Sequence, residues 1–349
     1  MQEIEIAGRK IGSGNPCFII AEAGVNHNGD VELAEQLVDV AAEVGADAVK
    51  FQTFTAERLL TRQALKADYQ LASTDAAESQ FDMIRKLELS RCAHVRLIEH
   101  AKRRGIVFLS TPFDEQSVDL LDDLAVPLFK MASGEITNLL LLEHVARKRK
   151  PMIVSTGMSY LKEIEEAVRA IRGGGCDALA LLHCTSNYPA EPLMCNLRAM
   201  ETMRQAFNLP VGYSDHTAGV EIAVAAVALG ASVLEKHFTL DRTLPGPDHR
   251  ASLEPNELRA MVRAVRNVEQ AIGHGVKQPM PSEQNTRIVA RRSLVAVVDL
   301  PAGTVLQEHH LAAKRPGIGL PPGELSGLIG RKLSKTLRAD ELIRWTDVE

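Results

Sequence analysis

Two histidines, His216 and His237, each stand at the end of a short apolar segment of the kind that forms a buried β-strand. If the two segments are neighbouring strands, their ends lie about 4.8 Å apart and both imidazoles can reach one ion. A lone histidine in such a place is more often a hydrogen-bonded core residue than a ligand. The pair in matching positions instead favours a metal site. Two nitrogens, completed by water and substrate oxygens, suit an octahedral ion such as Mn²⁺ better than a closed zinc site.

A second group of residues combines two lysines with several hydroxyls. Lys50 lies within the apolar segment AVKFQTF, and Lys130 lies within a similar segment, PLFKMA. Ammonium groups are rarely placed in such surroundings without partners. Serines stand at or just beyond the ends of other such segments: Ser133, Ser155 and Ser214. Because ammonium groups and hydroxyls both bind anionic oxygens, this set predicts a site for a small phosphorylated carboxylate.

Eight short apolar runs carry these residues, and segments with helical spacing separate them. The runs span residues 17–21, 46–51, 106–110, 127–132, 152–155, 178–184, 210–213 and 232–237. They are apolar on both faces, as parallel strands covered by helices must be. Eight strand–helix units predict a (β/α)8 TIM barrel, in which polar groups at the carboxyl ends of the strands form the active site. An open doubly wound sheet is the alternative, but no Gly-x-Gly-x-x-Gly follows the first strand.

Three further segments stand outside this repeat. Residues 4–11 alternate around Gly8 and predict a small hairpin. Residues 54–87 form a long insertion after the second strand, on the catalytic face. They contain Tyr69, Gln70 and Phe81, and we expect them to cover a substrate. Beyond the linker near Pro279, frequent prolines and glycines predict a small β-rich module. We therefore assign residues 1–280 to a catalytic barrel and residues 281–349 to a linker with a small β-rich domain.

Composition narrows the class of protein. The chain has 349 residues and a net charge of -5, without the basic patch that marks a nucleic-acid-binding protein. No apolar run approaches the ~20 residues of a membrane-spanning helix. The five cysteines form no Cys-x-x-Cys pair, which favours a reducing compartment, and we expect a cytoplasmic protein.

The segments that carry the chemistry also resemble a known family, the N-acetylneuraminate synthases, which include legionaminate synthases. The resemblance runs in order along nearly the whole chain. Its last segment resembles the antifreeze-like (SAF) β-clip domain of these enzymes, so the resemblance implies a TIM barrel with a small C-terminal β-clip domain. The matching segments are EAGVNHNG (22–29), VKFQT (49–53), STPFD (110–114), FKMASGE (129–135), STGM (155–158), LHCTSNYP (182–189), GYSDHT (212–217), EKHFTLDR (235–242), GPDHRASLEP (246–255) and KRPGIG (314–319).

The resemblance implies a role for each matching residue. His216 and His237 correspond to the metal ligands, with Mn²⁺ expected and Mg²⁺ or Co²⁺ as alternatives. The phosphoenolpyruvate contacts correspond to Lys50, Thr111, Lys130, Ser133, Ser155 and Ser214. The amino-sugar contacts correspond to Glu22, Gln52, Phe113, Tyr188 and Asp248, and Glu135 and Ser186 are added as substrate contacts. Glu22, Lys50 and Lys130 are expected to be catalytic. Ser186 departs from the pattern. Some members have Asn directly after the HCT segment, whereas this chain has Ser186 there and Asn187 next.

Arg315 corresponds to an arginine that the partner subunit inserts into the active site, so the resemblance implies a domain-swapped homodimer. The implied reaction joins phosphoenolpyruvate to N-acetylmannosamine or a closely related amino sugar, with cleavage of a C–O bond. A legionaminate synthase that uses 2,4-diacetamido-2,4,6-trideoxymannose is the first alternative. A class I aldolase with a Schiff base on Lys130 is more remote. The third hypothesis is that the C-terminal module mainly binds a carbohydrate or another partner.

Overall fold

The computed structural model describes residues 3–75 and 77–349 of the chain. The chain divides into two compact units, Met1–Gly273 and His274–Glu349, which are described separately below.

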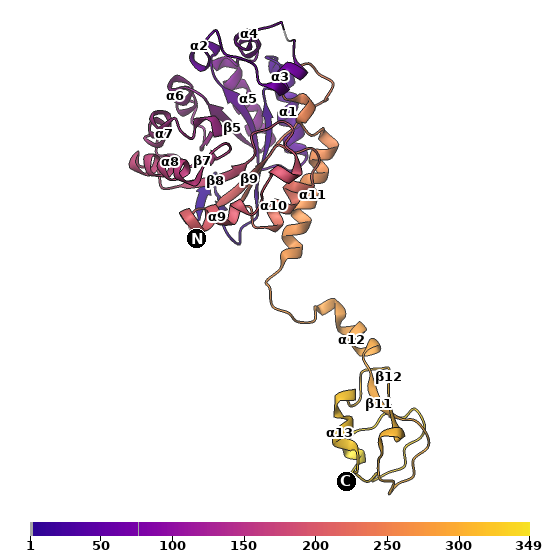
Figure 1. Cartoon of the computed structure of the whole chain (residues 1–349). Helices are drawn as coiled ribbons and strands as arrows, with labels where there is room; N and C mark the ends of the chain where they lie inside the picture. Colours follow the sequence, from indigo (N-terminus) through magenta and orange to yellow (C-terminus); the bar gives the residue numbers. More distant parts are fainter. Residues whose placement is uncertain (1–2, 76) are drawn as a thin grey trace. The chain divides into compact units, whose positions relative to one another are not determined.

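The first unit contains an eight-stranded parallel sheet in the order β5-β4-β3-β10-β9-β8-β7-β6. The two strands that end this order, β5 and β6, are themselves neighbours, so the sheet curls into a nearly closed barrel (Figure 1). Its strands are β3 (Phe18–Gly24), β4 (Ala48–Thr53), β5 (Val107–Pro112), β6 (Phe129–Met131), β7 (Met152–Ser155), β8 (Leu179–Cys184), β9 (Val211–Asp215) and β10 (Val233–His237). Each corresponds to one of the eight predicted runs, and the predicted (β/α)8 barrel is confirmed.

Helices follow the strands and cover the outside of the barrel (Figure 1). They are α1 (Val31–Glu43), α5 (Arg91–Arg104), α6 (Glu115–Asp123), α7 (Leu139–Ala146), α8 (Leu161–Gly173), α9 (Ala199–Phe207), α10 (Glu221–Ala228) and α11 (Pro255–Ile272). Asp30 caps α1, because its side chain accepts hydrogen bonds from the amides of Glu32 and Leu33.

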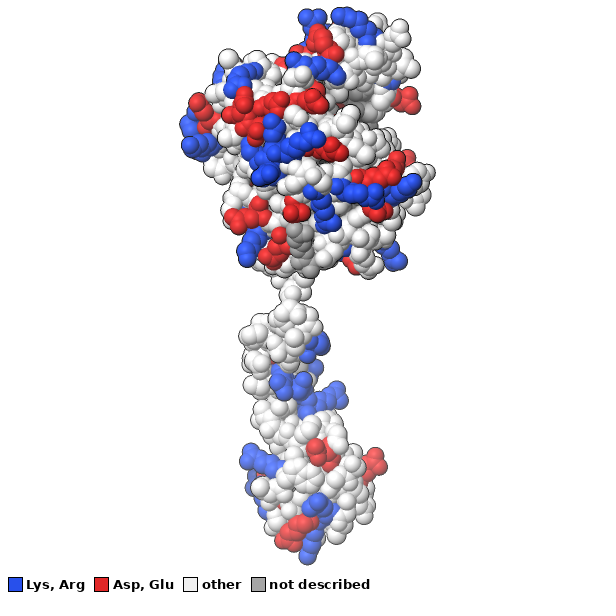
Figure 2. All heavy atoms as spheres, turned by 90° about the vertical axis from the view of Figure 1, so that its left-hand side faces the viewer, with Lys and Arg blue, Asp and Glu red and all other residues white. Residues whose placement is uncertain are grey.

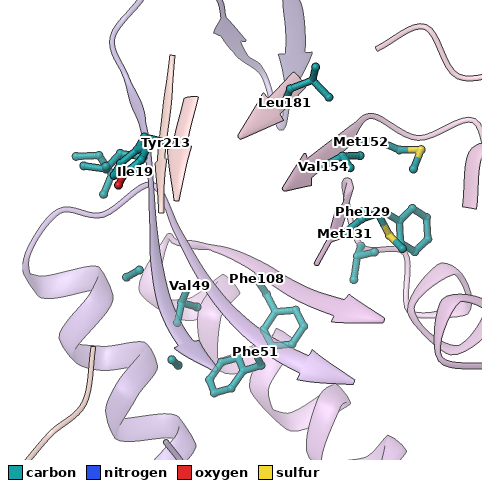
Figure 3. Close-up of a cluster of buried hydrophobic side chains, with 14 of the residues drawn as sticks. Ile19, Val49, Phe51, Phe108, Phe129, Met131, Met152, Val154, Leu181 and Tyr213 are labelled. Atoms are coloured by element: carbon teal, nitrogen blue, oxygen red, sulfur yellow. The ribbon is translucent and has the colours of Figure 1, made fainter. Parts of the chain in front are cut away.

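The main core lies between the strands and this helical layer. Figure 3 shows part of it: the rings of Phe51 on β4 and Phe108 on the adjacent β5 stack with centroids 5.7 Å apart. The helices contribute apolar stripes with helical spacing. In α1 the fully buried residues are Ala34, Leu37, Val38 and Ala41. Leu33 and Val40 of the same helix are only partly buried.

A smaller apolar cluster fills the barrel interior toward the amino ends of the strands. It includes Phe18 and Ile20 of β3, together with Ile6 and Ile11 of the N-terminal hairpin. The hairpin pairs β1 (Ile4–Ile6) with β2 (Arg9–Ile11), as predicted. The hairpin thus closes one end of the barrel with apolar side chains.

The insertion after β4 contains three short helices: α2 (Ala56–Leu59), α3 (Asp68–Ser73) and α4 (Gln80–Arg85). Of the three side chains that the sequence analysis named in the insertion, Gln70 and Phe81 make contacts within the insertion itself. Gln70 accepts a hydrogen bond from the amide of Ala67 at the start of α3. Phe81 is buried, with the Arg62 guanidinium 4.7 Å from its ring centroid.

The second unit has its own core around a two-stranded antiparallel sheet of β11 (Ser293–Ala296) and β12 (Leu311–Lys314), with the helices α12 (Gln284–Ala290) and α13 (Leu325–Leu328). Its buried side chains include Leu294, Leu306, Leu337 and Ile343. Irregular segments and short bridges make up most of the remainder.

Charges of both signs are interspersed over the barrel face in Figure 2, as the modest net charge suggests. Among the described helices, none combines the length and the apolar character that a membrane crossing requires.

Candidate active site

The parallel strands bring most of the predicted site residues to the carboxyl end of the barrel. Adjacent strands are in register, so that Glu22 lies beside both Lys50 and His237 in the sheet. The predicted residues that lie on or directly beyond these strand ends are Glu22, Lys50, Gln52, Thr111, Lys130, Ser133, Ser155, Ser186, Ser214, His216 and His237.

Lys50 lies at the centre of the first half of the site. Its Nζ is 2.7 Å from Glu22 Oε2 and donates a 2.9 Å hydrogen bond to Thr111 Oγ1. The Lys50 side chain is only 4% exposed. Since a charge so deeply buried needs partners, these contacts hold the ammonium in place inside the barrel.

Lys130 occupies the other half. Its Nζ donates to Ser155 Oγ at 2.8 Å and to the Met131 carbonyl at 3.2 Å, and it lies 3.3 Å from Glu235 Oε1. Three acceptors therefore surround the three protons of an ammonium group. This arrangement suits a fixed positive charge better than a free amine that attacks a carbonyl.

Glu235 connects the two lysines and was not among the predicted site residues. Its carboxylate lies 3.6 Å from Lys50 Nζ and 3.3 Å from Lys130 Nζ, and it accepts a 2.8 Å hydrogen bond from Ser214 Oγ. The signal for it was present in the sequence, since Glu235 stands two residues before His237 and so shares its side of the strand. The site is therefore a chain of alternating charges.

The buried charges shift each other's titration. Burial raises the pKa of Glu22 to about 7, even though the Lys50 ammonium opposes that rise. Burial alone would also raise the pKa of Glu235, but Lys130 and Lys50 outweigh it and hold this pKa below its usual range. Burial lowers the pKa of Lys130. Glu22 is thus the carboxyl of the site that can take up or release a proton near neutral pH.

The two histidines lie close together, with ring centroids 5.5 Å apart. His216 Nδ1 lies 2.8 Å from the Thr185 carbonyl, which can only accept, so Nδ1 carries the proton and Nε2 offers a lone pair. His237 Nδ1 is buried and has no hydrogen-bond partner among the described residues. Burial lowers the pKa of both imidazoles, and for His237 the neighbouring His216 lowers it further.

The pair fits a divalent metal. Neutral imidazoles are the form that binds metals, and the unpartnered nitrogen of His237 is a buried polar atom that an ion would satisfy. Within the described part of the chain, no group of three or more His, Cys, Asp or Glu side chains could hold an ion. The protein would therefore contribute two nitrogens, and water or substrate oxygens would complete the coordination.

Aromatic rings stand over the histidines. The Tyr188 ring centroid lies 4.2 Å from that of His216 and 5.5 Å from that of His237. Tyr69 of α3 lies 5.2 Å from Tyr188, centroid to centroid, and Ser73 Oγ donates to the Pro247 carbonyl. Of the three residues named in the insertion, Tyr69 is therefore the one that reaches the site and supports its predicted role as a cover. Gln70 and Phe81 contact other residues of the insertion instead.

Gly157 packs closely against polar side chains. Its amide donates to Ser133 Oγ at 3.0 Å, and a Cβ at this position would come within 2.2 Å of Ser186 Oγ. Only glycine fits between these side chains. Ser186, the departure from the family pattern, thus places its hydroxyl beside Ser133.

Other predicted residues lie at the margin of this group. Gln52 Nε2 and Glu22 Oε1 both approach the position of a Cβ on Gly24, at 3.6 and 3.3 Å. Asp248 is buried, and burial raises its pKa to about 6. Phe113 packs against Phe54, with centroids 6.0 Å apart. Glu135 accepts a local hydrogen bond from Asn138. Among the described ion pairs, none joins Glu135 to Lys50 or Lys130.

Arg315 belongs to the second unit. Its Nε donates a 3.0 Å hydrogen bond to the Ala290 carbonyl, at the end of α12. The side chain is otherwise exposed, and its predicted insertion into a partner's site remains a prediction.

Comparison with known proteins identifies the family. Residues 37–277 match the model of the NeuB family, and residues 291–349 match that of the SAF domain. The chain is 50% identical to an N,N'-diacetyllegionaminic acid synthase from Campylobacter jejuni, over 94% of this chain and 98% of that protein. A second synthase of this name, from Legionella pneumophila, is 47% identical, over 97% of this chain and 96% of that protein.

A solved structure agrees with these matches. The N-acetylneuraminic acid (sialic acid) synthetase from Leptospira borgpetersenii is 38% identical and superposes with a TM-score of 0.72, covering 82% of this chain and 95% of that one. The resemblance inferred from the sequence motifs, including that of the C-terminal domain, is confirmed. The chain belongs to the NeuB family and carries a C-terminal SAF domain.

Proposed function

We propose that this protein condenses phosphoenolpyruvate with an N-acetylated amino-sugar aldehyde to give a nonulosonic acid of the sialic-acid type and phosphate. The observation that carries this proposal is the chain Glu22–Lys50–Glu235–Lys130 beside two neutral histidines at the carboxyl end of one barrel. Residues 1–280 supply the catalytic domain, and residues 281–349 supply the linker and the SAF domain.

Phosphoenolpyruvate would bind across the two lysines. Lys50 with Thr111, and Lys130 with Ser155, offer ammonium and hydroxyl donors on opposite sides of Glu235. The hydroxyls of Ser133 and Ser186, which lie on either side of Gly157, add further donors for anionic oxygens. Charge-assisted hydrogen bonds of this kind are the strong ones, and they explain how a small trianion is held.

His216 and His237 would hold the divalent ion, with Mn²⁺ as the expected ion. When bound, such an ion supplies Lewis-acid polarisation of the sugar aldehyde. The protein's part is to hold two neutral imidazoles close together, with the Tyr188 ring beside them.

The bonds change in two places. The enol carbon of phosphoenolpyruvate attacks the aldehyde carbon, and water adds to the carbon that bears the phosphate. Phosphate then leaves with the bridging oxygen. Glu22 acts as the general acid or base that transfers the proton of this water or of the sugar hydroxyl, because the pKa of its carboxyl lies near neutrality. Phosphoenolpyruvate with ¹⁸O at the bridging position tests whether the C–O bond is the one that breaks. The label is expected in released phosphate, and its retention in the sugar would refute the mechanism.

The amino sugar would bind between the barrel and the insertion, near Gln52, Phe113, Tyr188 and Asp248. Tyr69 is an added candidate because its ring lies against that of Tyr188. Two sugars stay open. N-acetylmannosamine agrees with the sialic acid synthetase structure, and 2,4-diacetamido-2,4,6-trideoxymannose agrees with the names of the 50% and 47% identical relatives.

One assay decides both the function and the sugar. The purified protein with Mn²⁺ and phosphoenolpyruvate is given each sugar separately, and the products are identified by mass spectrometry. One of the two nonulosonic acids is expected. Absence of condensation with either sugar would contradict the proposal. Trapping of a reduced imine on Lys130 by borohydride would instead favour the aldolase alternative.

We further propose a cytoplasmic homodimer in which Arg315 of one subunit completes the site of the other. The planar guanidinium suits a carboxylate or an N-acyl group, and none of the strand ends that form the barrel site carries an arginine. Mixing Arg315→Ala with His237→Ala subunits tests this. Random pairing is expected to restore up to roughly a quarter of wild-type activity. Exchange of subunits without recovery would mean that each barrel uses its own SAF domain. A SAF domain that only binds another partner would leave catalysis intact when it is deleted.

A further inference from the structure

Asp215 and Lys236 form an ion pair that takes no part in the site described above. Lys236 Nζ lies 2.7 Å from Asp215 Oδ2, and the two side chains are 1% and 0% exposed. Among the described ion pairs, no other has both side chains buried to this degree. The two residues are directly paired between β10 and β9, and each immediately precedes one of the two histidines.

The pair lies on the opposite side of the sheet from the active site. Successive side chains of a strand point to opposite faces. Ser214 and Glu235, the preceding pair in the same register, face the barrel interior, because Glu235 contacts Lys50 and Lys130 there. Asp215 and Lys236 therefore face outward, behind the backbone that carries the histidines.

The same pair also fixes the backbone on both sides of His216. Asp215 Oδ1 accepts hydrogen bonds from Thr217 N at 2.9 Å and from Thr217 Oγ1 at 2.8 Å. Lys236 Nζ donates to the Thr217 carbonyl. The His216 carbonyl in turn accepts from the Ala190 amide at 2.8 Å. Side chains of two strands thus hold the residues on either side of His216.

We propose that Asp215 and Lys236 are positioning residues that lock the ends of β9 and β10 together, and so set the affinity of the histidine pair for a divalent cation. The inference rests on the metal site of the proposed function. Because two imidazoles alone bind weakly unless both face the same point, a small slide of one strand end would separate them. A buried ion pair adds little net stability over an apolar pair, so fixing geometry is the better explanation of its presence.

The test measures Mn²⁺ binding directly, by the electron paramagnetic resonance signal of free Mn²⁺ during titration of the full-length protein. The variants are Lys236→Met, which keeps the length of the side chain, and the double variant Asp215→Asn/Lys236→Met, which leaves no unpaired charge. Both are expected to raise the Kd for Mn²⁺ by roughly 10- to 100-fold, the range found for outer residues of metal sites.

Arg266→Met is the matched control. Arg266 Nη2 bonds to Asp47 Oδ2 at 2.8 Å, and Arg266 Nη1 donates to the Cys17 carbonyl, just before β3 begins. Losing this pair is expected to lower the unfolding temperature without changing the Kd for Mn²⁺. If Lys236→Met does not fold, the double variant decides the question.

The outcomes separate the two proposals. Wild-type Kd in the folded Lys236 variants, with only a lower unfolding temperature, would overturn the positioning role and leave the metal site standing. Equal Mn²⁺ binding by wild-type protein and His237→Ala would overturn the metal site itself, and this inference with it.

Discussion

The two ends of the barrel interior are built from the same strands but have opposite chemistry. Toward the amino ends, the interior is filled by apolar side chains and closed by the hairpin residues Ile6 and Ile11. Toward the carboxyl ends, it holds two lysines and two carboxylates, all buried. In five of the eight strand regions the change takes place within one two-residue step, at Ile20/Glu22, Ala48/Lys50, Leu128/Lys130, Ile153/Ser155 and Val233/Glu235.

This difference shows how a barrel supports a charged site. Burying ammonium and carboxylate groups is costly unless they are paired and hydrogen-bonded. The apolar end carries no such cost and gives a rigid base, while the charged end is held in place by Glu22, Glu235 and the hydroxyls around them. Changes at the charged end are therefore expected to affect function first, and changes at the apolar end to affect stability alone.

The largest expected effect follows removal of the metal. Dialysis against EDTA is expected to abolish synthesis, and Mn²⁺ to restore it. His216→Ala and His237→Ala are each expected to lower kcat/KM by roughly a thousandfold, since Lewis-acid polarisation contributes several kcal/mol. Steady-state kinetics measures the loss, and circular dichroism checks that the barrel is folded. Full activity in exhaustively metal-free enzyme would contradict the assignment.

The next effect is on stability at acid pH. Burial lowers the pKa of His27 to about 4, and its Nδ1 accepts a hydrogen bond from the Gly29 amide. Between pH ~6.5 and 4, His27 is protonated in the unfolded protein but stays neutral in the folded protein. The free energy of unfolding therefore falls as the pH drops from ~6.5 toward 4. The contribution is on the order of 3 kcal/mol. Urea unfolding of wild type and His27→Gln across this range checks it, and the variant is expected to show the shallower slope. Identical slopes would show that His27 has no part in the acid sensitivity.

A smaller effect concerns substrate affinity. Lys50→Met and Lys130→Met each remove charge-assisted hydrogen bonds worth about 1.5–3 kcal/mol, so the KM for phosphoenolpyruvate is expected to rise about 10- to 100-fold. The lysines stabilise the phosphate in ground and transition states alike, so kcat is expected to fall no more than KM rises. A collapse of kcat at unchanged KM would indicate a covalent or proton-transfer role instead.

The smallest effect is at the apolar end. Ile11→Val removes one methylene from a fully buried side chain and is expected to cost about 1 kcal/mol of unfolding free energy. Denaturant unfolding measures this cost. Both kinetic constants and the Kd for Mn²⁺ are expected to stay at their wild-type values. A change in KM would show that the two ends of the barrel are coupled.

Much of this architecture was predictable from the sequence alone. The eight apolar runs predicted the strands, because parallel strands buried on both faces must be apolar throughout. The polar residues that follow them predicted the position of Lys50, Lys130, His216 and His237, because the carboxyl ends of barrel strands meet at one face. These inferences need only local composition and the two-residue period of a strand.

Contacts between strands were decided by the tertiary structure. Glu235 becomes the common partner of Lys50 and Lys130 only when the barrel closes, since the two lysines come from β4 and β6. Tyr69 meets Tyr188 only because the insertion folds over the site, while the nearby Gln70 caps a helix instead. The Asp215–Lys236 pair likewise depends on the register of β9 against β10. A sequence states which residues a strand offers to each face, but the relative slide and curvature of neighbouring strands determine which of them touch.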